Sequence, residues 1–103
     1  MQKKVENFNN RLYCHKGSMP LYARLMDIDS ELGELAKEYL KSSDYGESEF
    51  KVTDDFKMEF GDVLYALLSL ANENNIDANQ SIDMALKKYE DRINKKKNMG
   101  SGK

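Results

Sequence analysis

Residues 53–74 read TDDFKMEFGDVLYALLSLANEN, and this stretch decides the fold. At about 100° per residue, its apolar side chains cover roughly two-thirds of the circumference of a helix. Thr53 or Asp54 can cap the free N–H groups of the first turn, and Asn75 tolerates the left-handed conformation that ends a helix. A helix that is apolar on so many sides must be covered by several neighbours.

The spacing of apolar residues in the rest of the chain indicates further helices. It predicts three of them, at about residues 2–15, 20–41 and 78–94. Asp77, followed three residues later by Gln80, matches a capping box at the start of the last helix. Residues 95–103 are polar and predict a disordered tail. We therefore expect one all-α domain over residues 1–103, a bundle of about four helices.

Composition bounds the class of protein. A length of 103 residues suits one domain, and 16 Lys and Arg against 18 Asp and Glu leave no basic surplus for dedicated nucleic-acid binding. The single cysteine, Cys14, cannot form an internal disulfide. The longest apolar run, residues 63–71, is about half of what a membrane helix needs. These features predict a soluble, cytoplasmic protein with no membrane partner.

The apolar surface of the 53–74 helix also bears on assembly. Three neighbouring helices in so short a chain cover one broad face of it, and the remaining apolar arc would form an exposed patch. Exposed patches of this kind mark interfaces. We therefore predict a homo-oligomer, at least a dimer, that completes the helical bundle.

Two acidic motifs share one pattern, E-x-G-[ED]. They are Glu31-Leu32-Gly33-Glu34 and Glu59-Phe60-Gly61-Asp62, whereas this composition predicts about 0.1 such occurrences by chance. In both helices the first acid lies about 90° from the middle of the apolar stripe and the second about 150° away. Packing the two stripes together therefore brings four carboxylates alongside each other.

Such a cluster needs an explanation beyond folding. Two carboxylates about 4 Å apart repel by roughly 4 kcal/mol at an effective dielectric constant near 20. Mg²⁺ or Mn²⁺ relieves this repulsion, because both ions take oxygen ligands. Gly33 and Gly61 cost roughly 1 kcal/mol each relative to alanine, which indicates close approach by a helix or a ligand. The alternative is an ordinary solvated acidic face, and periodicity alone favours it.

The two motifs resemble those of the MazG-like nucleotide pyrophosphohydrolases, within the all-α NTP pyrophosphatase superfamily. The similarity covers about residues 20–93 and includes the apolar run after Asp62, then Ala71-Asn72, Ile76-Asp77 and Ala85. It implies Mg²⁺-dependent conversion of a (d)NTP to (d)NMP and pyrophosphate, in nucleotide-pool control or house-cleaning. It also implies a dimer or a pair of dimers. The implied metal ligands and catalytic carboxylates are Glu31, Glu34, Glu59 and Asp62.

The same resemblance also bears on which residues orient water and bind phosphate, and on two alternative functions. One of Glu31 or Glu34 would orient the attacking water. Because an acidic site admits a polyanion only with its metal, basic residues must flank the far phosphates, and the candidates are Lys87, Lys88 and Arg92. Phosphoribosyl-ATP pyrophosphatase chemistry is one alternative. The other is a non-catalytic, regulatory helical oligomer that keeps metal or nucleotide binding, which is favoured by three departures from many relatives: Ser30, Ala85 and Tyr89.

Overall fold

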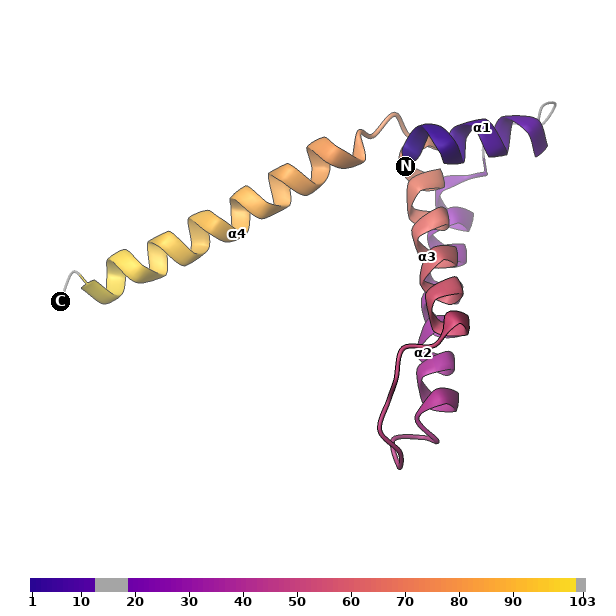
Figure 1. The fold of residues 1–103 in the computed structure, drawn as a ribbon. Coiled ribbons are helices and arrows are strands. Elements are labelled where there is room, and N and C mark those ends of the chain that lie inside the picture. Colours follow the sequence, from indigo (N-terminus) through magenta and orange to yellow (C-terminus); the bar gives the residue numbers. More distant parts are fainter. Residues whose placement is uncertain (13–18, 102–103) are drawn as a thin grey trace.

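A computed structural model describes residues 1–12 and 19–101 of the chain. These residues form four α-helices and no strand, which confirms the all-α class. The helices are α1 (Gln2–Leu12), α2 (Leu21–Ser42), α3 (Asp54–Glu73) and α4 (Ala78–Ser101) (Figure 1). Residues 13–15, predicted as the end of the first helix, lie outside the described residues. No helix in the described part of the chain is long and apolar enough to cross a membrane.

Short polar side chains set the helix ends, as the sequence predicts. Thr53 Oγ1 accepts a hydrogen bond from Phe56 N at 3.1 Å, and Asp77 Oδ1 accepts one from Gln80 N at 3.1 Å. Both satisfy N–H groups that the first turn of a helix leaves unpaired. Asn75 has a φ of 55° just after α3, so the chain leaves that helix through a left-handed residue.

The fourth helix is longer than the sequence indicates. It continues to Ser101, whereas its apolar periodicity ends near residue 94 and the residues that follow predict a tail. The three lysines after Asn94 are good helix formers, and the first glycine comes only at Gly100. Helix propensity therefore carries α4 beyond its apolar stripe. Residues 102–103 lie outside the described residues.

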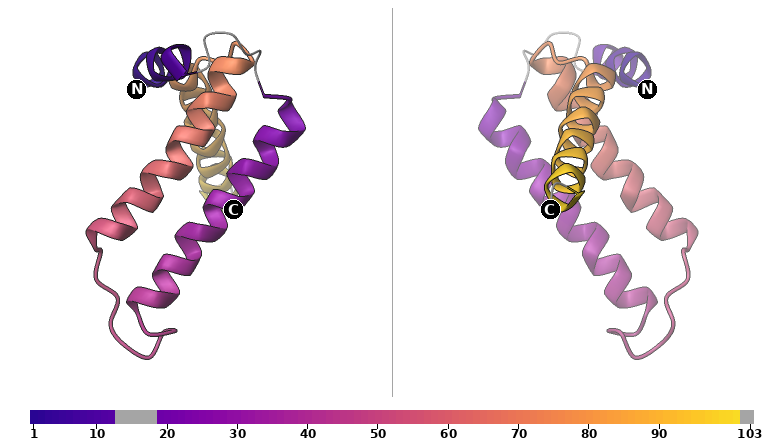
Figure 2. Two further views of the ribbon diagram at one scale, coloured as in Figure 1. Left: turned by 90° about the vertical axis from the view of Figure 1, so that its right-hand side faces the viewer. Right: turned by 90° about the vertical axis from the view of Figure 1, so that its left-hand side faces the viewer.

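The body of the molecule is the antiparallel pair α2 and α3, and α1 crosses the C-terminal end of α3 (Figures 1 and 2). The arm formed by α4 projects from this body and does not pack along α2 or α3, which gives the chain extents of 61 × 42 × 23 Å. One copy is therefore an open arrangement of four helices rather than a closed bundle.

The connector between α2 and α3 is anchored to both helices. Phe50 lies between Tyr39 and Phe56, with ring centroids 4.8 Å and 5.0 Å apart. Ser43 is fully buried, and its Oγ donates to the carbonyl of Tyr39 at 2.8 Å and accepts from Gly46 N at 3.1 Å. The composition of this segment predicts only a solvated loop, but these contacts fix the spacing of the two helices at this end.

The apolar core of one copy is small. The buried apolar residues of the described chain are Ala66, Leu68 and Ala71, all on α3. Many large apolar side chains on the other helices face solvent. Four that are more than half exposed are Leu25, Leu32, Leu86 and Ile93. Soluble monomers rarely leave so much contiguous apolar surface uncovered.

Candidate active site

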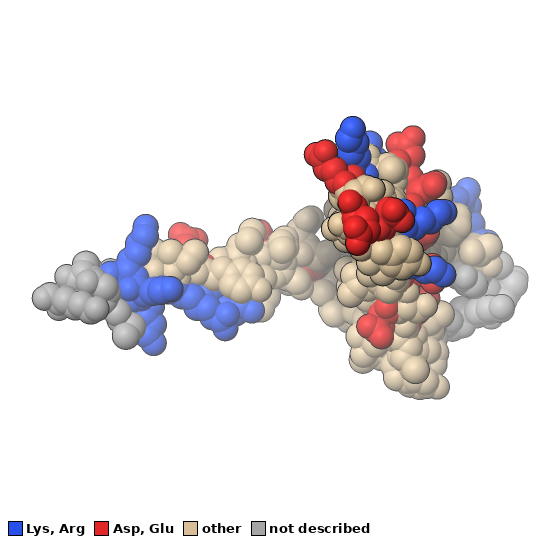
Figure 3. Space-filling model, turned by 90° about the horizontal axis from the view of Figure 1, so that it is seen from below, with Lys and Arg blue, Asp and Glu red and all other residues tan. Residues whose placement is uncertain are grey.

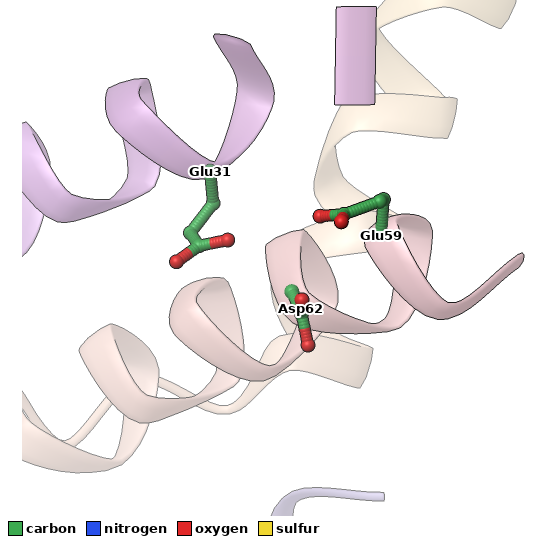
Figure 4. A group of neighbouring side chains, drawn as sticks. All are labelled: Glu31, Glu59 and Asp62. Atoms are coloured by element: carbon green, nitrogen blue, oxygen red, sulfur yellow. The ribbon is translucent and has the colours of Figure 1, made fainter. Parts of the chain in front are cut away.

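The packing of α2 against α3 brings the two acidic motifs face to face. Glu31 extends from α2 toward α3, where Glu59 and Asp62 lie one turn apart (Figure 4). Carboxylate oxygens of these three residues lie within 4.8 Å of one another, with Glu31 and Glu59 half-buried and Asp62 exposed. Three of the four residues that the sequence selects as metal ligands therefore converge.

The fourth, Glu34, lies one turn further along α2 and is exposed. It is outside the group of three, but it lines a concavity of about 320 Å³ together with Glu59. Partial desolvation raises the pKa of Glu59, and the negative charges of Asp62 and Glu34 raise it further. Glu34 thus stands at the edge of the carboxylate cluster and acts on it electrostatically.

The carboxylates of this cluster are not held in ion pairs among the described residues. Desolvation raises the pKa of Glu31, and the charge of Asp62 adds to the effect. Within the described residues, no Lys or Arg forms an ion pair with any of the four carboxylates. Four oxygen donors without a histidine or a cysteine match the ligand preference of Mg²⁺ or Mn²⁺. The residues present therefore fit a hard divalent ion.

A larger concavity of about 940 Å³ begins at Glu31 and Asp62 and extends toward α1. Its volume lies in the range of small-molecule sites. Other residues that line it are Glu6, Asn9, Asn10, Met19, Pro20, Arg24, Asp27, Tyr65, Ala66, Asn72 and Glu73. The carboxylate cluster therefore lies at one end of a space large enough for a ligand.

A buried arginine holds the wall of this concavity. Arg24 is 6% exposed, and it donates to both carboxylate oxygens of Glu73, at 2.7 Å and 3.0 Å, and to Asp27 at 3.1 Å. This fork ties the N-terminal half of α2 to the C-terminal half of α3. The sequence does not predict these contacts of Arg24. One feature of the sequence could have indicated a buried, paired arginine: Arg24 lies one turn before Ile28, on the apolar stripe of α2.

Polar contacts hold α1 across α3. Tyr65 Oη donates to Asn9 Oδ1, and Asn9 Nδ2 donates to Ser69 Oγ at 3.0 Å. At the other end of α1, Gln2 Nε2 donates to Asn72 Oδ1 and Asn72 Nδ2 donates to the Gln2 carbonyl, both at 3.0 Å. Apolar periodicity carries no signal for these contacts, so the sequence analysis assigned α1 no role at the site.

The predicted phosphate ligands lie on α4, away from the carboxylates of the same copy. Lys87 pairs with Asp91 at 3.4 Å, and Lys88 and Arg92 lie over the ring of Tyr89, at 4.8 Å and 6.0 Å from its centroid. Figure 3 shows mostly basic side chains along α4 and a mixture of acidic and basic side chains on the α2–α3 body. Phosphate binding by these residues stays a prediction, because α4 projects away from the α2–α3 body within one copy (Figure 1).

The two motif glycines face open space. A Cβ atom on Gly33 or Gly61 would meet no described atom within 4 Å, leaving aside its own helix backbone. The predicted close approach by another helix is therefore not found among the described residues of one copy. The space beside each glycine remains available to a ligand or to a second copy.

Comparison with known proteins agrees with this fold. Residues 23–96 match the MazG nucleotide pyrophosphohydrolase domain. The chain is 38% identical over 73 residues to YpjD, an uncharacterized protein of Bacillus subtilis (strain 168), and the match covers 68% of this chain and 64% of YpjD. The crystal structure of YpjD from Bacillus subtilis is similar with a TM-score of 0.69 and 31% identity, over 85% of this chain and 86% of that one.

The match includes both acidic motifs and most of α4, whereas α1 precedes it. The matched domain is one of nucleotide pyrophosphohydrolases. The chain belongs to the MazG nucleotide pyrophosphohydrolase family.

Proposed function

We propose that the chain is a Mg²⁺-dependent pyrophosphohydrolase that converts a (d)NTP to (d)NMP and pyrophosphate, in nucleotide-pool control or house-cleaning. The observation that carries the proposal is the convergence of Glu31, Glu59 and Asp62 within 4.8 Å, in a chain of this family. Glu34 completes the set of ligands from the edge of the cluster. Mn²⁺ is an alternative ion, because it takes the same oxygen ligands.

The reaction consumes one water molecule. Hydrolysis breaks one P–O bond of the bridge between the α- and β-phosphates. The bond broken is the one from the bridging oxygen to the α-phosphorus or the one to the β-phosphorus. The water oxygen forms a new bond to the phosphorus that loses the bridging oxygen. One of Glu31 or Glu34 orients the water and accepts its proton, which later passes to solvent. Mg²⁺ held by Glu31, Glu34, Glu59 and Asp62 would neutralise charge on the phosphate oxygens and lower the pKa of a water beside it.

We also propose a homo-oligomer, at least a dimer, in which α4 of one copy lies against the α2–α3 body of another. The small core of one copy and the exposed apolar stripe of α4 support this assembly. Charge complementarity supports it too, because α4 carries six basic and three acidic residues whereas α2 and α3 together carry four basic and ten acidic residues. In this arrangement Lys87, Lys88 and Arg92 contact the far phosphates at the carboxylates of the other copy.

A substitution that removes one negative charge and keeps the size of the side chain tests the proposed enzyme. Glu59→Gln replaces one carboxylate ligand by a neutral amide of the same volume, so we expect turnover of a (d)NTP in Mg²⁺ to fall at least about 100-fold. Glu47→Gln, in the exposed connector, is the matched control and keeps wild-type turnover. Circular dichroism and sedimentation of Glu59→Gln should match the wild-type chain.

Retention of turnover by Glu59→Gln, or turnover that persists in EDTA, would contradict the metal-dependent mechanism. A substrate panel that includes phosphoribosyl-ATP separates the two hydrolase alternatives. If every nucleotide survives while Mg²⁺ still raises the melting temperature, the non-catalytic module is the better account.

A further inference from the structure

The carboxylate cluster separates two concavities of different chemical character. Glu31 and Asp62 line the larger one, of about 940 Å³, and Glu34 and Glu59 line the smaller one, of about 320 Å³. Since oxygens of Glu31, Glu59 and Asp62 lie within 4.8 Å of one another, the two spaces adjoin at the cluster. A ligand bound at the cluster can therefore extend one part of itself into each space.

The larger concavity disfavours additional phosphate groups. Among the described residues that line it, Arg24 is the basic one, and each of its three guanidinium nitrogens donates a hydrogen bond to Glu73 or Asp27. Its other charged residues are carboxylates, so the field inside the concavity repels anions. Neutral amides and the phenol of Tyr65 supply the remaining polar groups. Such a wall suits an uncharged ring with hydrogen-bonding edges.

The first helix supplies the outer wall of this larger concavity. Asn9 is fixed by Tyr65 and Ser69, which makes it a positioning residue for α1. Asn10, the next residue, is exposed and lines the concavity, so its amide offers a donor and an acceptor to a ligand. Because α1 precedes the residues that match the family domain, this wall is a feature that the match does not cover.

The smaller concavity differs from the larger one in its basic residues. Lys37 and Lys41 lie one turn apart on α2 and line it together with Glu34, Glu38 and Glu59. Within the described chain neither lysine forms an ion pair, although three carboxylates share the same wall. Two lysine ammonium groups beside a metal-binding cluster suit a phosphate group that carries its own negative charge.

We infer that a nucleotide binds along the α2–α3 groove in one direction, with its nucleoside end in the larger concavity beside Asn10 and its pyrophosphate end beside Lys37 and Lys41. This inference rests on the proposed function, because it orients the substrate of that reaction. It assigns base contacts to α1 and assigns the leaving pyrophosphate to the C-terminal half of α2. The two products of hydrolysis then occupy different concavities.

The two products therefore serve as separate probes. We would measure inhibition of turnover by a nucleoside monophosphate and by pyrophosphate, each in Mg²⁺, and titrate both ligands by calorimetry, which needs no turnover. The variants are Asn10→Ala and the double variant Lys37→Gln/Lys41→Gln. The matched controls are Asn7→Ala, on α1 but outside both concavities, and Lys57→Gln on α3.

We expect Asn10→Ala to weaken binding of the monophosphate about fivefold, as for a lost hydrogen bond, and to leave pyrophosphate within about twofold. The double lysine variant should weaken pyrophosphate about tenfold and leave the monophosphate within about twofold. Both controls should bind both products as the wild-type chain does.

The reversed pattern would overturn the inference, and so would equal weakening of both products or no change in either variant. A wild-type chain that hydrolyses no nucleotide contradicts the proposed function instead, and in that case the calorimetric titrations still decide the direction of binding.

Discussion

Protonation of Glu31 and Glu59 affects both the stability of the chain and its binding of a metal ion. Because desolvation and neighbouring carboxylates raise the pKa of both, the folded chain holds more protons than the unfolded chain just above the ordinary glutamate pKa. Stability of the metal-free protein therefore falls as pH rises through this window. The ionised carboxylates are the form that binds a cation, so metal binding opposes this loss.

We expect Mg²⁺ to raise the melting temperature more at about pH 7.5 than at about pH 5, measured against EDTA at each pH. Glu47→Gln should show the same pH dependence as the wild-type chain, whereas Glu59→Gln should show a smaller one. An equal Mg²⁺ effect at both pH values would contradict the assignment of these carboxylates as the metal ligands.

The sequence predicts the positions of the carboxylate residues better than it predicts the contacts of the residues around them. Helical spacing places Glu31, Glu59 and Asp62 on facing edges, and the structure brings them together. Glu34 lies one turn further out, because residues three apart on a helix differ by about 300° and 4.5 Å along the axis. The partners of Arg24 could not be predicted, since Glu73 is 49 residues away and only the packing of two helices joins them.

Among the elements, α2 and α3 depend on the ion pair between Arg24 and Glu73. Both side chains are largely buried, with 7% and 15% of their side-chain surface exposed. Removing one partner of a buried pair leaves the other charge without compensation. We expect Arg24→Met to lower the free energy of unfolding in urea by about 3 kcal/mol, at one fixed protein concentration.

Lys57→Met is the matched control on α3, because Lys57 pairs with Asp54 at 3.9 Å in solvent. It should leave the urea midpoint nearly unchanged. If Arg24→Met also unfolds at the wild-type midpoint, the arginine does not hold the two helices together, and the wall of the larger concavity needs another explanation.

The elements show where periodicity is informative and where it is not. The predicted bounds of α2 and α3 lie within one residue of the observed ones, because Pro20 and Thr53 mark helix starts in the sequence itself. The end of α4 was predicted too early, since lysines extend a helix without adding to its apolar stripe. The placement of α1 depends on amide and hydroxyl contacts with α3, which no repeating pattern encodes.

For the whole molecule, the exposed stripe of α4 is the feature that calls for a partner. Leu86 belongs to that stripe and is 56% exposed, whereas Met84 lies on the opposite face and is 67% exposed. We expect Leu86→Glu to shift the protein to a smaller species in sedimentation velocity and to reduce turnover. Met84→Glu places the same charge on the other face and should keep the wild-type assembly.

A wild-type chain that sediments as a well-folded monomer at micromolar concentration would contradict the proposed oligomer. So would a Leu86→Glu variant that keeps the wild-type sedimentation coefficient. The sequence predicts an assembly but not its geometry. The apolar surface of the helix at residues 53–74 is larger than the other helices of the chain can cover, which shows that a partner is needed but not where it lies.

In the proposed mechanism, the carboxylates of α2 and α3 support hydrolysis of a nucleoside triphosphate between its α- and β-phosphates. The most direct test follows the purified chain with a panel of canonical and modified (d)NTPs by phosphorus NMR, in Mg²⁺ and in EDTA. We predict resonances of a monophosphate and pyrophosphate in Mg²⁺ alone. Formation of a diphosphate and free phosphate, or no product from any nucleotide, would contradict the account.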